Sequence, residues 1–581
     1  MLLNLIHRPI PTDKKCVEAF EFQQDVAHRN GFRTTILLPV PALFDKATIE
    51  QVKSYRQDYG DEVGIYFYNL NCREFKEKFN TLEYQYWLFS QADKKKIADW
   101  AFEVFGENFG FVPSAVGSYY FDVDSLAYIK KKYPSVECAL ATCFEEGANV
   151  FRGTNGYWHL YSEGGPWWPW IPSKNHIHAP AMNSAQSLDV VALPHLVRDM
   201  LHSILHRDDC YASHPANLLR GKIYKDKGLA YDLNFIDQYI HQEKFNGGYS
   251  YYNMFVGPNW VASRHYYEED VKVSRDLYVK TLNYLGKKKK EGSVQDMTMT
   301  EFGRWFKANR KLDDVDQCYW KDILYGSRRS IYWIRTNGYR ATIDPMAGSA
   351  ITDLRPYASQ VKMPVGAGAK DLWNGSYPFV LNQYRKGGIN YFGRAGVFSA
   401  SILFKDKKFD LTFERTEIES LDPDNRSFSS PFTLETPEGP LVVEKTCKFS
   451  GSDITIDFKL ISSPGKQPVE VTQYFTGVQG ITGSGDYPED IRGITMEASN
   501  AQGKKRLPIS YTSKMITVEN PTKLMANLPK LDLKLSLVPM NKCDSGKIAD
   551  ACLSGPMYQM ALVKTIKPKE RMSICLRIEK K

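Results

Sequence analysis

Several features are missing from this sequence, and each absence excludes a class of protein. No apolar run in the 581 residues approaches the roughly 18 that a membrane-spanning helix needs, so an integral helical membrane protein is excluded. No two cysteines have the C-x-x-C spacing of a zinc ribbon or a thioredoxin motif, and the H-E-x-x-H motif of zinc proteases is also missing. A net charge of +8 gives no nucleic-acid signature. An ordinary globular chain remains.

The composition is typical of a globular protein in all but its aromatic content. Hydrophobic residues make up 43% and charged residues 24%, while aromatic residues reach 13%. Aromatic rings pack well in cores, and they also form platforms for flat apolar surfaces such as the faces of sugar rings. The length predicts two to four domains.

The chain begins with a hydrophobic segment directly after Met1. Residues 2–6 predict a first buried strand, without the charged region, long apolar region and cleavage site of a signal peptide. Either the protein is cytoplasmic, or an export signal was removed and a methionine added. The sequence does not separate these two localisations.

Strand-like and helix-like segments alternate through the first half of the chain. Strands are predicted at 2–6, 34–40, 62–68, 111–119, 137–143 and 188–193, and helices at 16–30, 47–59, 94–105 and 125–132. Such alternation is typical of βαβ units with a parallel sheet. Thr298 and Glu301 form a predicted capping box, and the Lys287–Lys290 run is expected in a solvated loop. We expect a (β/α)7-8-type barrel over residues 1–325, catalytic or glycan-binding.

The second half has a different rhythm. Short alternating segments at 330–336, 339–343, 398–404, 410–415, 441–449, 453–460 and 469–474 are separated by turn residues. This pattern is typical of an all-β sandwich. Residues 330–581 are therefore expected to form a β-sandwich accessory domain, and the fold class is α/β followed by all-β.

In barrels of parallel strands, function gathers where the strands end. Polar residues follow several predicted strands: His7 after the first, Asp122 after the fourth, and Glu145 and Glu146 after the fifth. These residues are candidates for substrate contact or catalysis.

A loop of about 40 residues follows the fifth predicted strand and is rich in large rings. It contains Tyr157, Trp158, Trp167, Trp168 and Trp170, interleaved with glycine and proline that exclude a regular helix. Rigid rings of this kind form sugar subsites, although the loop could instead fold its rings inward as a small core. His176 and His178 follow the loop and are predicted to hydrogen-bond sugar hydroxyls.

Hydrolysis of a glycosidic bond needs two carboxyl groups facing each other across that bond. Glu145 and Glu146 are neighbours on opposite faces of a strand, so they cannot form the pair together. One of them could pair with Asp122 or Glu163, and Asp124 is a further partner. Each of these carboxylates could alternatively cap a helix or form a salt bridge.

A metal site has little support in the sequence. His176 and His178, like His202 and His206, have ligand-like spacing, but such pairs occur often by chance. We expect neither a metal nor another cofactor.

The sequence resembles the glycoside hydrolase/deacetylase β/α-barrel superfamily in three features. These are the order of its strands, residues 111–124, and the Glu145–Glu146 strand end followed by residues 167–173. That superfamily includes NodB-like polysaccharide deacetylases, and bacteroidetal members carry a C-terminal β-domain; residues 330–581 resemble mutarotase-like sandwiches more loosely. NodB-type enzymes hold a metal with two aspartates after the first strand and an H-x-x-x-H motif after the third. Here the first strand leads into His7-Arg8-Pro9, so this metal site is not expected.

The sequence as a whole predicts a glycoside hydrolase that acts on a poly- or oligosaccharide through a carboxylate pair and a tryptophan-rich loop. A non-catalytic glycan-binding protein and a polysaccharide deacetylase with a different site remain alternatives. The expected partner is a carbohydrate, with no nucleic acid and no integral membrane segment, and the oligomeric state is open.

Overall fold

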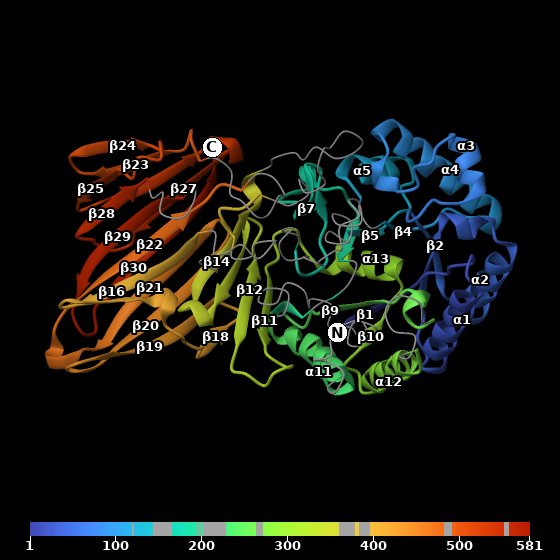
Figure 1. The fold of residues 1–581 in the computed structure, drawn as a ribbon, viewed down its shortest axis with the longest axis horizontal. Coiled ribbons are helices and arrows are strands. Elements are labelled where there is room, and N and C mark those ends of the chain that lie inside the picture. The colour runs from blue at the N-terminus through green and yellow to red at the C-terminus, as the bar shows by residue number, and fades with distance from the viewer. Residues whose placement is uncertain are drawn as a thin grey trace.

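The computed structural model shows an α/β domain and a β-rich domain side by side (Figure 1). It describes residues 1–118, 121–142, 166–194, 197, 199–201, 228–262, 271–359, 378–382, 396–480, 491–550 and 557–581. In these ranges, no helix combines the length and the apolar character that a membrane crossing requires.

The N-terminal domain is built on a parallel sheet. Its strands are β1 (Leu2–His7), β2 (Thr35–Pro39), β3 (Glu62–Tyr66), β4 (Ala115–Gly117), β5 (Cys138–Thr142), β8 (Val191–Pro194), β9 (Tyr251–Phe255) and β10 (Gln295–Asp296). They lie in the order β9-β1-β2-β3-β4-β5-β8, and β10 pairs with the start of β1. The Asn253 side-chain amide on β9 donates to the Pro194 carbonyl on β8 at 2.8 Å. The sheet is therefore a nearly closed, barrel-like layer, which confirms the predicted architecture in its coarse form.

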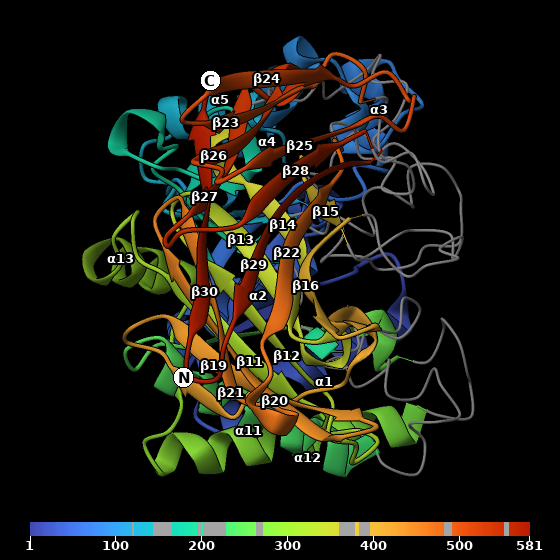
Figure 2. The same cartoon turned by 90° about the vertical axis from the view of Figure 1, so that its left-hand side faces the viewer.

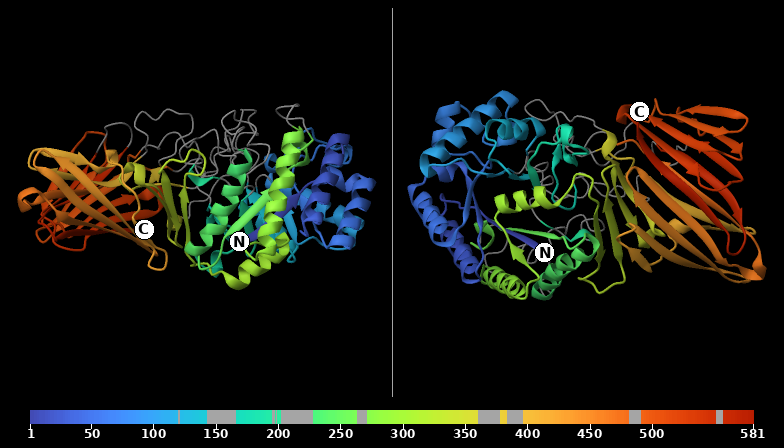
Figure 3. Two further views of the ribbon diagram at one scale, coloured as in Figure 1. Left: turned by 90° about the horizontal axis from the view of Figure 1, so that it is seen from below. Right: turned by 180° about the vertical axis from the view of Figure 1, so that it is seen from behind.

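Helices cover the outside of this sheet (Figure 3). They are α1 (Lys14–Arg29), α2 (Lys46–Tyr59), α3 (Arg73–Phe79), α4 (Gln91–Phe109), α5 (Val123–Lys132), α11 (Gly228–His241), α12 (Val271–Lys290) and α13 (Met299–Asn309). The capping box predicted at Thr298 and Glu301 is present at the start of α13. The lysine run 287–290 is the last turn of α12 and not a loop, because cations are favourable at the negative end of a helix dipole.

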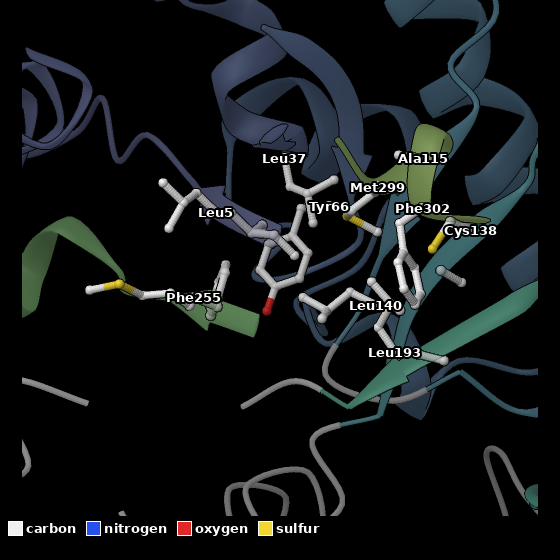
Figure 4. Packing of buried hydrophobic residues seen from close by; sticks show 14 of the residues in the cluster. Leu5, Leu37, Tyr66, Ala115, Cys138, Leu140, Leu193, Phe255, Met299 and Phe302 are labelled. Carbon is white, nitrogen blue, oxygen red and sulfur yellow. The ribbon is translucent and has the colours of Figure 1, made fainter. Parts of the chain in front are cut away.

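The inside of the sheet is filled by side chains from several strands (Figure 4). Tyr66 and Leu37 meet there because β3 and β4 carry glycine beside them: a Cβ added at Gly117 would lie 2.7 Å from the Tyr66 ring and 2.8 Å from Leu37. The barrel is thus a packed core, and only the ends of its strands remain for chemistry.

The C-terminal domain consists of two antiparallel sheets (Figure 2). The first contains β11 (Asp316–Lys321), β12 (Ser330–Arg335), β13 (Tyr339–Asp344), β14 (Ala350–Pro356), β15 (Leu381–Asn382), β16 (Val397–Phe404), β17 (Lys407–Asp410), β22 (Val469–Gly477), β25 (Met515–Glu519), β28 (Ser545–Ala549) and β29 (Tyr558–Ile566). The second contains β18 (Ser420–Asp422), β19 (Ser427–Thr436), β20 (Gly439–Ser450), β21 (Asp453–Ser462), β23 (Thr495–Asn500), β24 (Gly503–Pro508), β26 (Lys523–Leu528), β27 (Leu533–Pro539) and β30 (Arg571–Lys580). Strict alternation of buried and half-buried residues along β22 is typical of a sheet with one face in a core. The predicted sandwich is therefore confirmed as a sandwich-like domain.

Candidate functional site

Arg8 lies at the carboxyl edge of the parallel sheet inside a group of aromatic rings. It follows β1 directly, and only 4% of its surface is exposed. Its guanidinium carbon lies 4.6 Å from the centre of the Tyr68 ring, 5.8 Å from Tyr66 and 5.7 Å from Phe255. Because the rings come from the β3 and β9 ends, they fix a planar cationic donor at the edge where barrel chemistry is expected.

Gly257 leaves space for this guanidinium. A Cβ added there would lie 2.6 Å from Asn259 Oδ1, 3.1 Å from Arg8 Nη2 and 3.2 Å from Arg8 Nε. Its backbone has φ −66° and ψ 144°, a conformation that any residue adopts, so the crowding is the only cost of a side chain.

We therefore expect Gly257→Ala to displace Arg8. If a substrate is turned over at this edge, its kcat/KM should fall about 10- to 100-fold, because small misplacements of a positioning group are costly. The melting temperature should change little. The matched control is Gly106→Ala inside α4, where nothing lies within 4 Å of the added Cβ. Equal activity of the two variants would show that Arg8 is not part of the site.

His7 points away from this edge, which corrects its predicted role in substrate binding. Its Nε2 lies 2.7 Å from the Tyr278 hydroxyl of α12, and its ring is buried between the sheet and the helices. Successive side chains of a strand face opposite sides, so either His7 or Arg8 can face the interior, and it is Arg8 that meets the rings of β3 and β9. Burial lowers the pKa of His7 to about 4.

Acid is expected to destabilise the fold through His7. Its pKa is lower in the folded than in the unfolded chain, so the stability that neutral His7 contributes is complete above about pH 6.5 and falls towards pH 4. Between pH 7 and pH 5 the loss is about 2 kcal/mol. The unfolding free energy of His7→Gln should fall less than that of the wild type over this interval. The unfolding free energies of both proteins can be measured by urea titration at pH 7 and pH 5. If the wild type and His7→Gln lost the same free energy between these pH values, His7 would not be the group that causes the acid sensitivity.

Asp122 is occupied within the fold and does not serve as an open catalytic carboxylate. It caps α5: Oδ1 accepts from the Ser125 backbone N–H at 2.8 Å and from Gln91 Nε2 at 2.9 Å. Oδ2 accepts from Lys94 Nζ at 2.7 Å and from the Ser125 hydroxyl at 2.8 Å. Burial by itself would raise the pKa of Asp122, but the adjacent Lys94 ammonium lowers it below its ordinary value. The helix-cap alternative therefore describes this residue.

The described part of the tryptophan loop folds inward. Trp168 and Trp170 are each 1% exposed, and their indole N–H groups donate to the backbone carbonyls of Gln317 at 3.0 Å and Ile177 at 2.9 Å. Trp167 is buried as well. This corrects the prediction that these three rings form an open stacking surface: all three are buried, and Trp168 and Trp170 hold this part of the loop through their indole hydrogen bonds.

His176 and His178 lie on the hairpin strand β7 (His176–Pro180), paired with β6 (Pro172–Ser173), and both are buried. Burial is the larger cause, and the nearby positive charge of Arg355 the smaller one, that lower the pKa of His176 to about 3. Arg355 belongs to β14, where Asp353 forms ion pairs with it and with Arg340. His176 thus lies near the sandwich domain, and the contact of both histidines with a sugar stays a prediction.

Five predicted site residues lie outside the described residues: Glu145, Glu146, Tyr157, Trp158 and Glu163. The ends of their loop are described. Thr142 at the end of β5 pairs with Pro194 of β8, and Trp170 exchanges two backbone hydrogen bonds with Ala192 of β8, at 3.1 and 2.7 Å. The loop therefore leaves from β5 and returns alongside its neighbour β8.

The sequence places Arg8, Tyr68 and Asp199 at the ends of predicted strands, but it does not select them as site residues, and it does not point to Phe255 at all. Asp199, buried after β8, accepts a hydrogen bond from the Tyr231 hydroxyl at 2.7 Å. All four residues follow or end a strand, but nothing in the sequence distinguishes them from other residues at strand ends.

Within the described ranges, no three His, Cys, Asp or Glu side chains form a group that could hold a metal ion.

Comparison with known proteins gives one family match. Residues 33–320 match the family model DUF3863. This model describes a domain of unknown function with a solved structure, and it covers the greater part of the α/β domain. No curated protein matches the chain.

Among solved structures, the chain is similar to a glycoside hydrolase/deacetylase candidate from Parabacteroides distasonis, with 16% identity over 63% of this chain and 86% of the other and a TM-score of 0.46. It is also similar to a galactose mutarotase-like protein from Clostridium acetobutylicum (10% identity, 46% and 98% covered, TM-score 0.30). A third similarity is to the 4-alpha-glucanotransferase from Thermococcus litoralis (8% identity, 100% and 99% covered, TM-score 0.30). At these identities and TM-scores, the similarities do not identify an activity for this chain.

Proposed function

We propose that this chain is a carbohydrate-active enzyme, and more narrowly a glycoside hydrolase acting on a poly- or oligosaccharide at the carboxyl edge of the parallel sheet. The observation that carries the proposal is the attachment of the acidic, ring-rich loop to this edge. Its first end continues β5, and its second end is hydrogen-bonded to β8 through Trp170.

Covalent geometry limits how far the proposed acids can lie from these attachments. Glu145 follows Thr142 by three residues, and Glu163 precedes the described Pro166 by three. Three residues span at most about 11 Å. Glu145 and Glu163 thus lie in the sequence close to the two loop ends that attach to β5 and β8, and they are the pair that we propose to face the glycosidic bond.

The roles follow from the chemistry of the reaction. One carboxyl group, with a raised pKa, protonates the leaving oxygen, and the other acts as nucleophile or as the base that activates water. Tyr157 and Trp158 stack on the sugar. Arg8, held flat by its rings, donates hydrogen bonds to substrate oxygens at the same edge. Asp122, Trp167, Trp168 and Trp170 have no part in this mechanism, because the fold already uses them.

The test is a screen of the purified protein against aryl glycosides and a panel of polysaccharides, with reducing ends, free acetate and binding measured on the same samples. Release of reducing ends from at least one substrate is the expected result. Acetate release without new reducing ends would favour the deacetylase, and binding without either product would favour a glycan-binding protein. Either outcome would overturn the hydrolase.

A further inference from the structure

A groove crosses the outer face of the first sandwich sheet, distant in sequence from the barrel edge. Its volume is about 850 Å³, and its floor is made by β16, β22 and β29, with β28 and β25 beyond them. Figure 2 shows these strands next to one another. Five neighbouring strands give four spacings, or about 19 Å from β16 to β25. We call this feature the sheet groove.

The floor of the sheet groove is rich in hydroxyl and amide groups. Ser401 and Thr472 face each other across β16 and β22, and Thr476 faces Gln559 across β22 and β29. Gln559 Nε2 donates to Thr476 Oγ1 at 2.9 Å, which orients both side chains. Such groups donate and accept hydrogen bonds without charge, as a partner made of hydroxyl groups requires.

An aromatic ring stands at one side of this floor. Phe413 is 84% exposed, more than any other aromatic residue in the described part of the chain. It ends the short helix η10 (Leu411–Phe413), whose position is fixed by Asp410: Oδ1 of Asp410 accepts from the Thr412 backbone N–H at 3.0 Å and from the Tyr474 hydroxyl at 2.8 Å. A solvent-facing ring on a backbone held in this way is suited to stacking on the flat apolar face of a sugar.

The charges of the sheet groove balance. Its lining carries two carboxylates, Asp410 and Glu470, and two ammonium groups, Lys408 and Lys547. This balance favours a neutral ligand over a polyanion. Strand addition by a peptide is also disfavoured, because β22 in the middle of the floor is already paired on both sides, with β16 and β29.

We propose that the sheet groove binds a neutral polysaccharide, several sugar units at a time, and so holds the polymer on the sandwich domain without cleaving it. The hydroxyl-lined floor, the exposed Phe413 ring and the balanced charges carry this inference. The site is separate from the barrel edge, so it can exist whether or not the barrel hydrolyses glycans.

The test is affinity electrophoresis of the full chain in gels containing xylan, starch, galactomannan or mixed-linkage β-glucan, with polygalacturonate as the anionic comparison. At least one neutral polymer should retard the protein. Phe413→Ala should weaken binding about tenfold, and Thr472→Arg, which fills the floor, should abolish it. Met540→Ala, which removes an exposed side chain outside the groove, is the matched control and should bind normally.

Phe413→Ala added to Glu145→Gln separates binding in the sheet groove from binding at the barrel edge, because only the sheet groove predicts that the added substitution weakens retardation. Glu145→Gln alone is the reference. It should keep full retardation, since the sheet groove does not need the proposed catalytic acid. No retardation in any of the four neutral gels, retardation by polygalacturonate alone, or equal binding of wild type, Phe413→Ala and Thr472→Arg would overturn the proposal. The proposal would also be overturned if the wild type were a dimer in gel filtration and both Phe413→Ala and Thr472→Arg were monomers. The groove would then be an interface between copies of the chain.

Discussion

Glu145→Gln is expected to lower kcat about 10²- to 10⁴-fold on the substrate found in the screen, while substrate affinity changes little. Glutamine keeps the size and polarity of the side chain, but it can neither donate an acidic proton nor attack as a carboxylate. If Glu163 is the partner, Glu163→Gln should produce a loss of similar size, and the double variant should lose little more than either single one, because the two groups act as a unit.

Glu146→Gln is the internal control for this prediction. Only Glu145 of these two residues belongs to the proposed catalytic pair, so Glu146→Gln should keep most of the turnover. Glu103→Gln, an exposed carboxylate on α4, should match the wild type. If all four single variants retained wild-type turnover, the proposed acids would have no catalytic role.

Asp122→Ala is expected to lower the unfolding free energy by about 3–5 kcal/mol at pH 7. The substitution leaves the Lys94 ammonium buried beside the vacated carboxylate position, with a side chain that is 0% exposed. It also removes the cap of α5. The pKa of Asp122 is depressed, so the contribution of this ion pair is complete above the ordinary carboxyl pKa and disappears as the pH falls below that range.

Two further variants make this stability experiment specific. Replacing both partners, as in Lys94→Met with Asp122→Leu, should cost much less than Asp122→Ala alone, because no unpaired charge remains. Asp124→Ala, at the exposed neighbouring position, should cost less than about 1 kcal/mol. An Asp122→Ala variant with normal stability and no activity would return Asp122 to the catalytic pair.

The regular parts of the fold could be predicted from the sequence because they depend on local signals. The helix expected at 47–59 spans Lys46–Tyr59, with Asp45 as its N-cap and Gly60 in the left-handed conformation at its end. The strand expected at 62–68 spans Glu62–Tyr66. Periodicity and caps determine such elements within a few residues, so little information from the rest of the chain is needed.

The candidate site was harder to predict because it depends on which way side chains face. His7 and Arg8 both follow an apolar run, and only the pairing of β1 with β9 and β2 determines that Arg8 meets Tyr66, Tyr68 and Phe255. Trp168 and Trp170 share the Gly- and Pro-rich setting expected of an exposed subsite. In the structure both rings are buried, and their indole N–H groups donate to the backbone carbonyls of Gln317 and Ile177. Gln317 lies 149 residues after Trp168 in the sequence. No local pattern contains such a contact.

The measurement that tests the central claim most directly is a crystal structure of Glu145→Gln with an uncleaved oligosaccharide. The account predicts that the sugar lies at the carboxyl edge, within reach of Arg8, with residues 145 and 163 on either side of one glycosidic bond. The Cδ atoms of the two side chains should be about 5–5.5 Å apart for a retaining enzyme or about 6.5–9.5 Å apart for an inverting one. A sugar bound elsewhere, or two acids too far apart to span one bond, would contradict the account.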